Sequence, residues 1–372
     1  MKLIHLVPSL DERHGGPSKS VRSLANALAR SGEAVQLLAT TDRGEPVARA
    51  DAASLRQFPR VMPRWLSRSP GLREYLQTQS GDCLHHHSLW LLTLRYAHET
   101  ARRSGVPLVI SPRGMLSGWA YRHHRWRKQL AESFVHPGAF AGAAGWHATS
   151  PDEADDIRKL GFTQPVCVSP NGVVAPERAT LHAARETWHQ LCPATRTRRV
   201  ALFYSRFHRK KRLRELIALW LAVPRGDWFL LIVGVAEEET AATLTAVIAA
   251  AGAQESMAVF DGANRPPPYA AASLFLLPSH SENFGLVIAE SLAAGVPVLV
   301  TDTTPWQEVA REQCGWCVSW SDYAATLATV LALPNDELKA RGERGRVWMQ
   351  RNFSWENAAQ LLRDFYRSLR IA

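Results

Sequence analysis

Residues 279–300 restrict the fold more than any other part of the chain, because a polar turn, a helix-sized segment and a buried strand follow one another there. A short apolar run precedes this stretch. Ser281 and Asn283 are candidate N-caps for the helix, and Gly295 followed by Pro297 is a typical stop. We therefore predict a strand, a turn, a helix and a second strand, in that order.

The start of this helix is a candidate anion site, since its unpaired N–H groups and positive dipole end face the turn. Gly285, between Phe284 and Leu286, lets the backbone approach a ligand closely. Glu282 and Glu290 would lie roughly 12 Å apart if the chain between them is helical. A glycosidase pair needs about 5 to 9.5 Å. The spacing instead suits an elongated ligand such as a sugar nucleotide; the alternative is an ordinary αβ unit with two incidental glutamates.

Composition sets the broad class of protein. A chain of 372 residues with 46% hydrophobic residues suits two domains with cores of their own. The net charge of +10 favours anionic partners, namely nucleotides, nucleic acid or anionic lipid. Five scattered cysteines argue against a disulfide framework. The apolar runs are strand-sized and the N-terminus does not resemble a signal peptide, so we expect a cytoplasmic protein.

The N-terminal region begins with a strand–helix–strand pattern, in which strands are expected at residues 3–7 and 34–39. Gly15 and Gly16 stand just before the intervening helix and form either a phosphate-binding loop or a tight turn. Residues 44–80 lack clear periodicity and are expected to be irregular and partly helical.

A second chemical signal is the run of histidines in the strand expected at residues 83–87. His85 and His87 share one face of this strand and His86 lies on the other. Three neighbouring histidines of one strand cannot all converge on one point, so the pattern does not favour a metal site. Arg113 follows the next strand, at residues 108–111.

Residues 119–128 interleave tryptophans with basic side chains. Such a segment can contact an anionic membrane surface or a lipid-linked acceptor. A solvated basic face over buried tryptophans is the main alternative, and nucleic-acid binding is the least favoured one.

A basic loop follows the strand expected at residues 200–204. Ser205, Arg206 and Lys211 lie in this loop, which leads into the next helix. In an open α/β sheet, cations between a strand end and a helix start are placed to bind a diphosphate. A solvated basic loop is the alternative.

These motifs resemble the retaining glycosyltransferases of family 4, and the resemblance covers nearly the whole chain. Its most specific parts are the two glutamates, Glu282 and Glu290, and the loop with Arg206 and Lys211, in which Ser205 replaces the usual glycine. The resemblance implies an α/β fold of GT-B architecture, with two Rossmann-like doubly wound domains facing across a cleft. The expected domains are residues 1–175 on the acceptor side, 176–352 on the donor side, and a C-terminal helix at 353–372 that returns to the first domain.

The resemblance also implies the roles of residues. It assigns catalysis to Arg206, Lys211 and Glu282, and acceptor-side contacts to His87 and to Arg113, which stands where many relatives have a histidine. The donor-binding residues that it implies are Gly15, Gly16, Ser205, Phe284, Gly285, Leu286 and Glu290. No metal is expected, since no Asp-x-Asp motif is present.

The implied activity is the transfer of a hexosyl-type sugar from a nucleotide-diphosphate sugar to a hydroxyl of a glycan or lipid-linked acceptor. Configuration would be retained, and the product would belong to lipopolysaccharide or exopolysaccharide biosynthesis, on the inner face of the membrane. A non-catalytic protein of the same fold that binds nucleotide sugars or anionic lipid is the alternative function.

Overall fold

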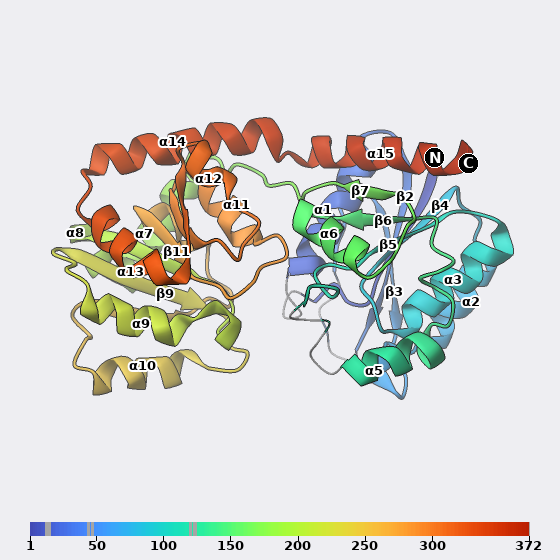
Figure 1. Ribbon diagram of the computed structural model, residues 1–372, viewed down its shortest axis with the longest axis horizontal. Helices are drawn as coiled ribbons and strands as arrows, with labels where there is room; N and C mark the ends of the chain where they lie inside the picture. Colours follow the sequence, from blue (N-terminus) through green and yellow to red (C-terminus); the bar gives the residue numbers. More distant parts are fainter. Residues whose placement is uncertain (12–15, 43–44, 46–47, 119–120, 122–124, 372) are drawn as a thin grey trace. The chain divides into compact units, whose positions relative to one another are not determined.

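Two parallel β-sheets flanked by helices make up the computed structural model (Figure 1), which describes residues 1–11, 16–42, 45, 48–118, 121 and 125–371. The chain divides into two compact units. The first consists of Met1–Gly172 and Phe353–Ala372, and the second of Val173–Asn352.

The first unit is built on a seven-stranded sheet in the order β3-β2-β1-β4-β5-β6-β7, with parallel neighbours throughout. Such sheets bury both faces under helices, which is why the strands read as short apolar runs. The strands are β1 (Lys2–Val7), β2 (Ala34–Thr41), β3 (Ser54–Pro59), β4 (Cys83–His87), β5 (Leu108–Ser111), β6 (Gly145–Ala148) and β7 (Val166–Val168).

Helices cover both faces of this sheet. They are α1 (Gly16–Arg30), η2 (Arg64–Leu66), α2 (Pro70–Thr78), α3 (Leu92–Ser104), α5 (Arg125–Leu130), the π-helix η3 (Ala131–Val135), α6 (Pro151–Lys159) and the C-terminal α15 (Trp355–Ile371).

The C-terminal helix α15 belongs to the core of the first unit. Leu362 and Tyr366 are fully buried there in one cluster with Leu24 and Leu28 of α1. The backbone approaches α15 closely at Gly172, where an added Cβ would lie 2.5 Å from the Trp355 nitrogen. Packing therefore attaches the last helix to the first sheet.

The second unit carries a six-stranded parallel sheet in the order β10-β9-β8-β11-β12-β13. Its strands are β8 (Arg199–Tyr204), β9 (Trp228–Gly234), β10 (Met257–Asp261), β11 (Leu274–Leu277), β12 (Val298–Thr301) and β13 (Gly315–Val318). Its helices are α7 (Arg178–Leu191), α8 (Ala194–Thr197), η4 (Arg209–Lys211), α9 (Leu213–Ala222), α10 (Ala241–Ala250), η5 (Pro268–Ala271), α11 (Leu286–Ala293), α12 (Glu308–Arg311), α13 (Trp320–Leu331) and α14 (Asn335–Asn352).

The expected α/β class and the strand at residues 274–277 are confirmed, and two local predictions are wrong. Residues 54–59 form the edge strand β3, whose side chains are at most half-buried, so the region lacked the apolar pattern of a central strand. Ser281 and Asn283 are not N-caps: α11 begins at Leu286, and Gly285 in the left-handed conformation (φ 74°) is its N-cap. No helix among the described residues is long and apolar enough to cross a membrane.

Gly234, the last residue of β9, fixes the loop that follows β8. A Cβ added at Gly234 would lie 1.9 Å from the Ser205 carbonyl oxygen and 2.6 Å from the Phe207 ring. We expect Gly234→Ala to displace this loop and to lower the free energy of unfolding by at least about 1–3 kcal/mol. Chemical denaturation of the purified variant measures this change.

Gly71 in α2 provides the matched control for this prediction, because an added Cβ would meet only Phe58 at 3.8 Å. Gly71→Ala should leave stability unchanged or raise it by about 0.5–1 kcal/mol. Equal stability of the Gly234→Ala variant and the native protein would show that the loop is not held by this contact.

Candidate functional site

The basic loop of the second unit leaves β8 and is fastened to β9 by its backbone. The N–H groups of Ser205 and Phe207 donate to the carbonyls of Val233 (3.2 Å) and Val235 (2.9 Å). The Phe207 side chain is buried, which anchors the loop in the core. The short helix η4 then turns the chain so that Lys211 points inward.

Lys211 and Glu282 form a buried ion pair. Their side chains are only 9% and 10% exposed, and the ammonium donates directly to the Glu282 carboxylate. The Ser279 hydroxyl donates to the same carboxylate oxygen at 2.6 Å. Burial by itself would raise the pKa of Glu282, but the Lys211 charge and these hydrogen bonds outweigh it and lower that pKa. The structure thus joins two candidate residues 71 positions apart in sequence.

Arg206 lies at the exposed end of the same loop. It donates to Glu237 at 2.6 Å, with 42% of its side chain exposed. Lys210 is more deeply placed: burial lowers its pKa, while the charge of Glu282 acts in the opposite direction. Lys210 was not among the site residues predicted from the sequence, although its place in the basic run beside Lys211 was a usable signal.

The turn before α11 is held by Trp306. The indole N–H of Trp306 donates to the Phe284 carbonyl, and the two rings meet edge to face with centroids 5.3 Å apart. A Cβ at Gly285 would lie 2.9 Å from Ile288, so both the space and the positive φ require glycine. The Trp306 hydrogen bond and the conformation of Gly285 therefore fix the point at which α11 starts, at Leu286, shortly after Glu282.

Glu290, on α11, contacts a residue that sequence analysis missed. The Tyr269 hydroxyl lies 2.9 Å from its carboxylate and 3.2 Å from the Val287 carbonyl. Burial and the Glu290 charge raise the pKa of Tyr269 well above its usual value, so its hydroxyl stays protonated and donates. The expected pair of glutamates thus faces two different partners, Lys211 for Glu282 and Tyr269 for Glu290.

The first unit brings His87 and Arg113 together. The Arg113 guanidinium donates to His87 Nδ1 at 3.0 Å and to Asn171 Oδ1 at 2.9 Å. The His87 side chain is fully buried and Arg113 is 8% exposed. Gly16 is the exposed first residue of α1, whereas Gly15 lies outside the described residues.

A histidine cluster surrounds this pair. His5 stands beside His85 in the register of β1 and β4, and its Nδ1 lies 3.0 Å from His87 Nε2. As expected, His86 points to the opposite face, where it contacts Thr93 at 3.0 Å. His5 was missed, although its position inside an expected strand was a signal.

One ring nitrogen from each of His5, His85 and His87 lies within 4.8 Å of the others, so these residues are the candidate ligands for a metal ion among the described residues. The Arg113 guanidinium, 3.0 Å from His87, would repel a cation there. The chemistry of the cluster therefore does not favour a metal.

Family comparisons match both units. A glycosyl transferase 4-like domain matches residues 15–172, and the glycosyl transferases group 1 family matches residues 184–348. The chain therefore belongs to the family 4 glycosyltransferases of GT-B architecture.

Individual proteins agree with this assignment. Lipopolysaccharide core biosynthesis mannosyltransferase LpsB of Rhizobium meliloti (strain 1021) is 31% identical over 154 residues, or 39% of this chain. The match covers 44% of that relative, so the chain spans less than half of its length. The GDP-mannose:cellobiosyl-diphosphopolyprenol alpha-mannosyltransferase of Xanthomonas campestris is 26% identical over 99% of this chain and 97% of its own. The fold matches Anabaena HepE in complex with UDP-glucose, with a TM-score of 0.76, 16% identity and coverage of 99% and 100%.

Proposed function

We propose that the protein transfers a hexosyl-type sugar from a nucleotide-diphosphate sugar to a hydroxyl of a glycan or lipid-linked acceptor, with retention of configuration. We place this reaction in the synthesis of lipopolysaccharide or another surface polysaccharide. The observation that carries the proposal is the buried Lys211–Glu282 pair, which lies beside the start of α11.

In this proposal the second unit binds the donor. Negative charge develops on the diphosphate as it leaves, and Arg206, Lys210 and Lys211 are the cations available in the loop after β8. The N–H groups at the start of α11 add a positive dipole end, which contributes at most about 2 kcal/mol. A preorganised donor contributes about 3–4 kcal/mol in the transition state, so the cations dominate the rate.

The carboxylates orient the donor by its hydroxyls. Glu282 would accept from the sugar and Glu290 from the ribose. In this proposal the acceptor hydroxyl attacks the face of the sugar from which the diphosphate leaves, and the leaving phosphate takes up the proton of that hydroxyl. Lysine and helix N–H groups take the place of a metal ion in this scheme.

A thermal-shift screen with UDP-, GDP- and dTDP-sugars tests the donor site directly. A bound donor stabilises the folded state by RT ln(1 + [L]/Kd), about 2.7 kcal/mol at 100 Kd. Because both mannosyltransferase relatives named above align with this chain, we expect GDP-mannose to give the largest shift. No shift with any of the sugars, and no nucleotide release in the presence of glycan acceptors, would contradict the proposal.

A peripheral contact with the membrane is a further part of the proposal. Trp126, Leu130 and Phe134 recur every four residues on α5 and η3, with 59%, 47% and 72% exposure. Arg127 and Lys128 follow Trp126 on the same segment. Residues 119–120 and 122–124 of the basic-aromatic segment lie outside the described residues. Exposed aromatic and basic side chains of this kind suit the headgroup region of an anionic bilayer.

We expect the double substitution Trp126→Ser and Phe134→Ser to weaken co-sedimentation with phosphatidylglycerol-containing vesicles by at least about tenfold, which corresponds to 1.4 kcal/mol of lost burial. Leu361→Ser is the control, because Leu361 is also 47% exposed but lies on α15. If the double variant and the native protein bind the vesicles equally, these side chains of α5 and η3 do not contribute to membrane binding.

A further inference from the structure

Arg113 is a buried cation held by two neutral partners. It follows β5, at the carboxyl edge of the first sheet, and adopts a left-handed backbone conformation (φ 55°). Its two terminal nitrogens donate to the Asn171 amide oxygen and to the His87 ring, at 2.9 and 3.0 Å. Neither partner carries a negative charge that would balance the guanidinium.

His87 accepts this hydrogen bond as a neutral ring. Burial, together with the neighbouring charges of His85 and Arg113, holds its pKa well below the usual value. Because His87 Nδ1 accepts from Arg113, the proton of His87 sits on Nε2 and points at His5 Nδ1, 3.0 Å away. The histidines thus fix the orientation of the guanidinium without neutralising it.

Burial lowers the pKa of Arg113 and the negative charge of Glu153 opposes this shift, but the Glu153 carboxylate forms its hydrogen bonds with other groups. It accepts from the N–H of Gly114 at 2.6 Å, and from the N–H and hydroxyl of Thr149 at 2.7 and 2.9 Å. Among the described residues, no carboxylate oxygen forms an ion pair with Arg113, and its Nε–H has no hydrogen-bond partner.

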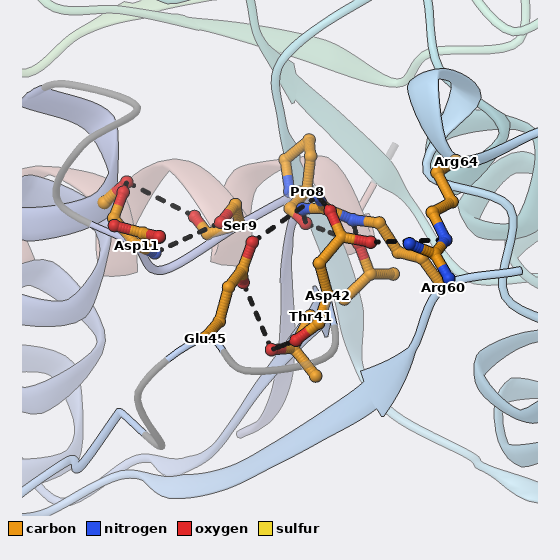
Figure 2. A network of polar contacts seen from close by, with 10 residues as sticks. Pro8, Ser9, Asp11, Thr41, Asp42, Glu45, Arg60 and Arg64 are labelled. Atoms are coloured by element: carbon orange, nitrogen blue, oxygen red, sulfur yellow. Dashed lines mark hydrogen bonds and ion pairs between the residues drawn. The ribbon is translucent and has the colours of Figure 1, made fainter.

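Arg60 is another buried arginine of the first unit, and its guanidinium is paired with carboxylates. Its side chain is 7% exposed, but it pairs with Asp42 at 2.7 Å and lies 3.8 Å from Glu45 (Figure 2). It also donates to the carbonyl of Pro8 at 2.7 Å, so its charge and its donors are satisfied. Buried charges in proteins are normally paired in this way, and Arg113 departs from that rule.

We propose that Arg113 binds an oxyanion on the acceptor, either a phosphate or a sugar carboxylate. A guanidinium recognises both groups through paired N–H donors. In open α/β sheets, ligands bind outside the carboxyl ends of the strands, which is the edge where Arg113 stands. The inference deepens the proposed function and rests on it, since the donor diphosphate already has its cations in the second unit.

The test follows the Arg113 Nε–H signal in ¹H–¹⁵N side-chain spectra, assigned by its loss in Arg113→Lys. If that variant does not fold, Asn171→Ser assigns the signal through its displacement. Sodium pyrophosphate and sodium glucuronate are titrated separately at constant ionic strength, with sodium chloride as the reference. The same titrations in an Arg206→Gln, Lys210→Ala, Lys211→Ala background remove the three cations proposed for the donor.

We expect a saturable downfield shift with pyrophosphate, glucuronate or both, which persists in that background and in the surface control Arg102→Gln. A response to pyrophosphate alone indicates a phosphate-bearing acceptor, and a response to glucuronate alone indicates an acidic sugar. No shift beyond that with chloride, or a shift that is lost in the background without the donor cations, would overturn the inference. These titrations do not measure sugar transfer, so their failure is distinct from failure of the proposed function.

Discussion

Lys211→Ala is expected to lower the rate of sugar transfer by about 100-fold or more. The Lys211 ammonium forms the buried ion pair with Glu282 and is the cation proposed to meet the leaving diphosphate. Loss of one preorganised donor to a developing anion costs about 100- to 1,000-fold in kcat. Steady-state assays with the donor identified by the thermal-shift screen measure the effect.

The same substitution leaves the Glu282 carboxylate buried without its ammonium, which costs about 3–5 kcal/mol of stability. A second variant separates folding from chemistry. Lys211→Ala with Glu282→Gln removes the unpaired charge, so it should regain stability but not transfer. Lys339→Ala removes an exposed lysine of α14 and should change neither property. Near-normal turnover of Lys211→Ala, measured on folded protein, would refute the assigned role.

The second large effect is a loss of stability in mild acid. Burial lowers the pKa of the five histidines on β1, β4 and β6 of the first unit, to about 3 for His5 and His86. The other three on these strands are His85, His87 and His147. Burial lowers the pKa of His98 as well, and that of His136 to about 4. In the unfolded chain each titrates near 6.5, so the unfolded state binds more protons below that pH. The stabilisation is therefore complete above pH 6.5 and is lost as the pH falls.

Between pH 7.5 and 5.5 each such histidine costs about 1.4 kcal/mol, and the five together cost about 7 kcal/mol. This is a large part of the 5–15 kcal/mol that stabilises a typical domain. Urea denaturation across this pH range, followed by near-UV circular dichroism, measures the dependence.

The exposed His182 of α7 is the matched control for the acid effect. His182→Gln should keep the full slope of stability against pH, whereas His86→Gln, which removes one of the five, should reduce the loss of stability between pH 7.5 and 5.5 by about 1.4 kcal/mol. A stability that stays flat from pH 7.5 to 5.5 would mean that the histidines are protonated in the folded protein.

Much of the fold was predictable from local sequence. The segments at residues 83–87 and 274–277 are strands within those bounds, because buried parallel strands need continuous apolar or neutral side chains. β3 was not predictable, because an edge strand is only half-buried and carries no such pattern. The start of α11 was placed too early, since Gly285 caps the helix with its backbone and not with a polar side chain.

The sequence by itself determined the α/β class, the positions of central strands such as β4 and β11, and the residues that carry charge near the strand ends. Only the tertiary structure decided which of these residues meet: Lys211 with Glu282, Tyr269 with Glu290, and Arg113 with His87. The physical reason is that strand and helix periodicity acts over a few residues, whereas these contacts join separate elements of the same unit. The partner of a buried charged side chain depends on which strands lie next to each other in the sheet, and local sequence does not encode that order.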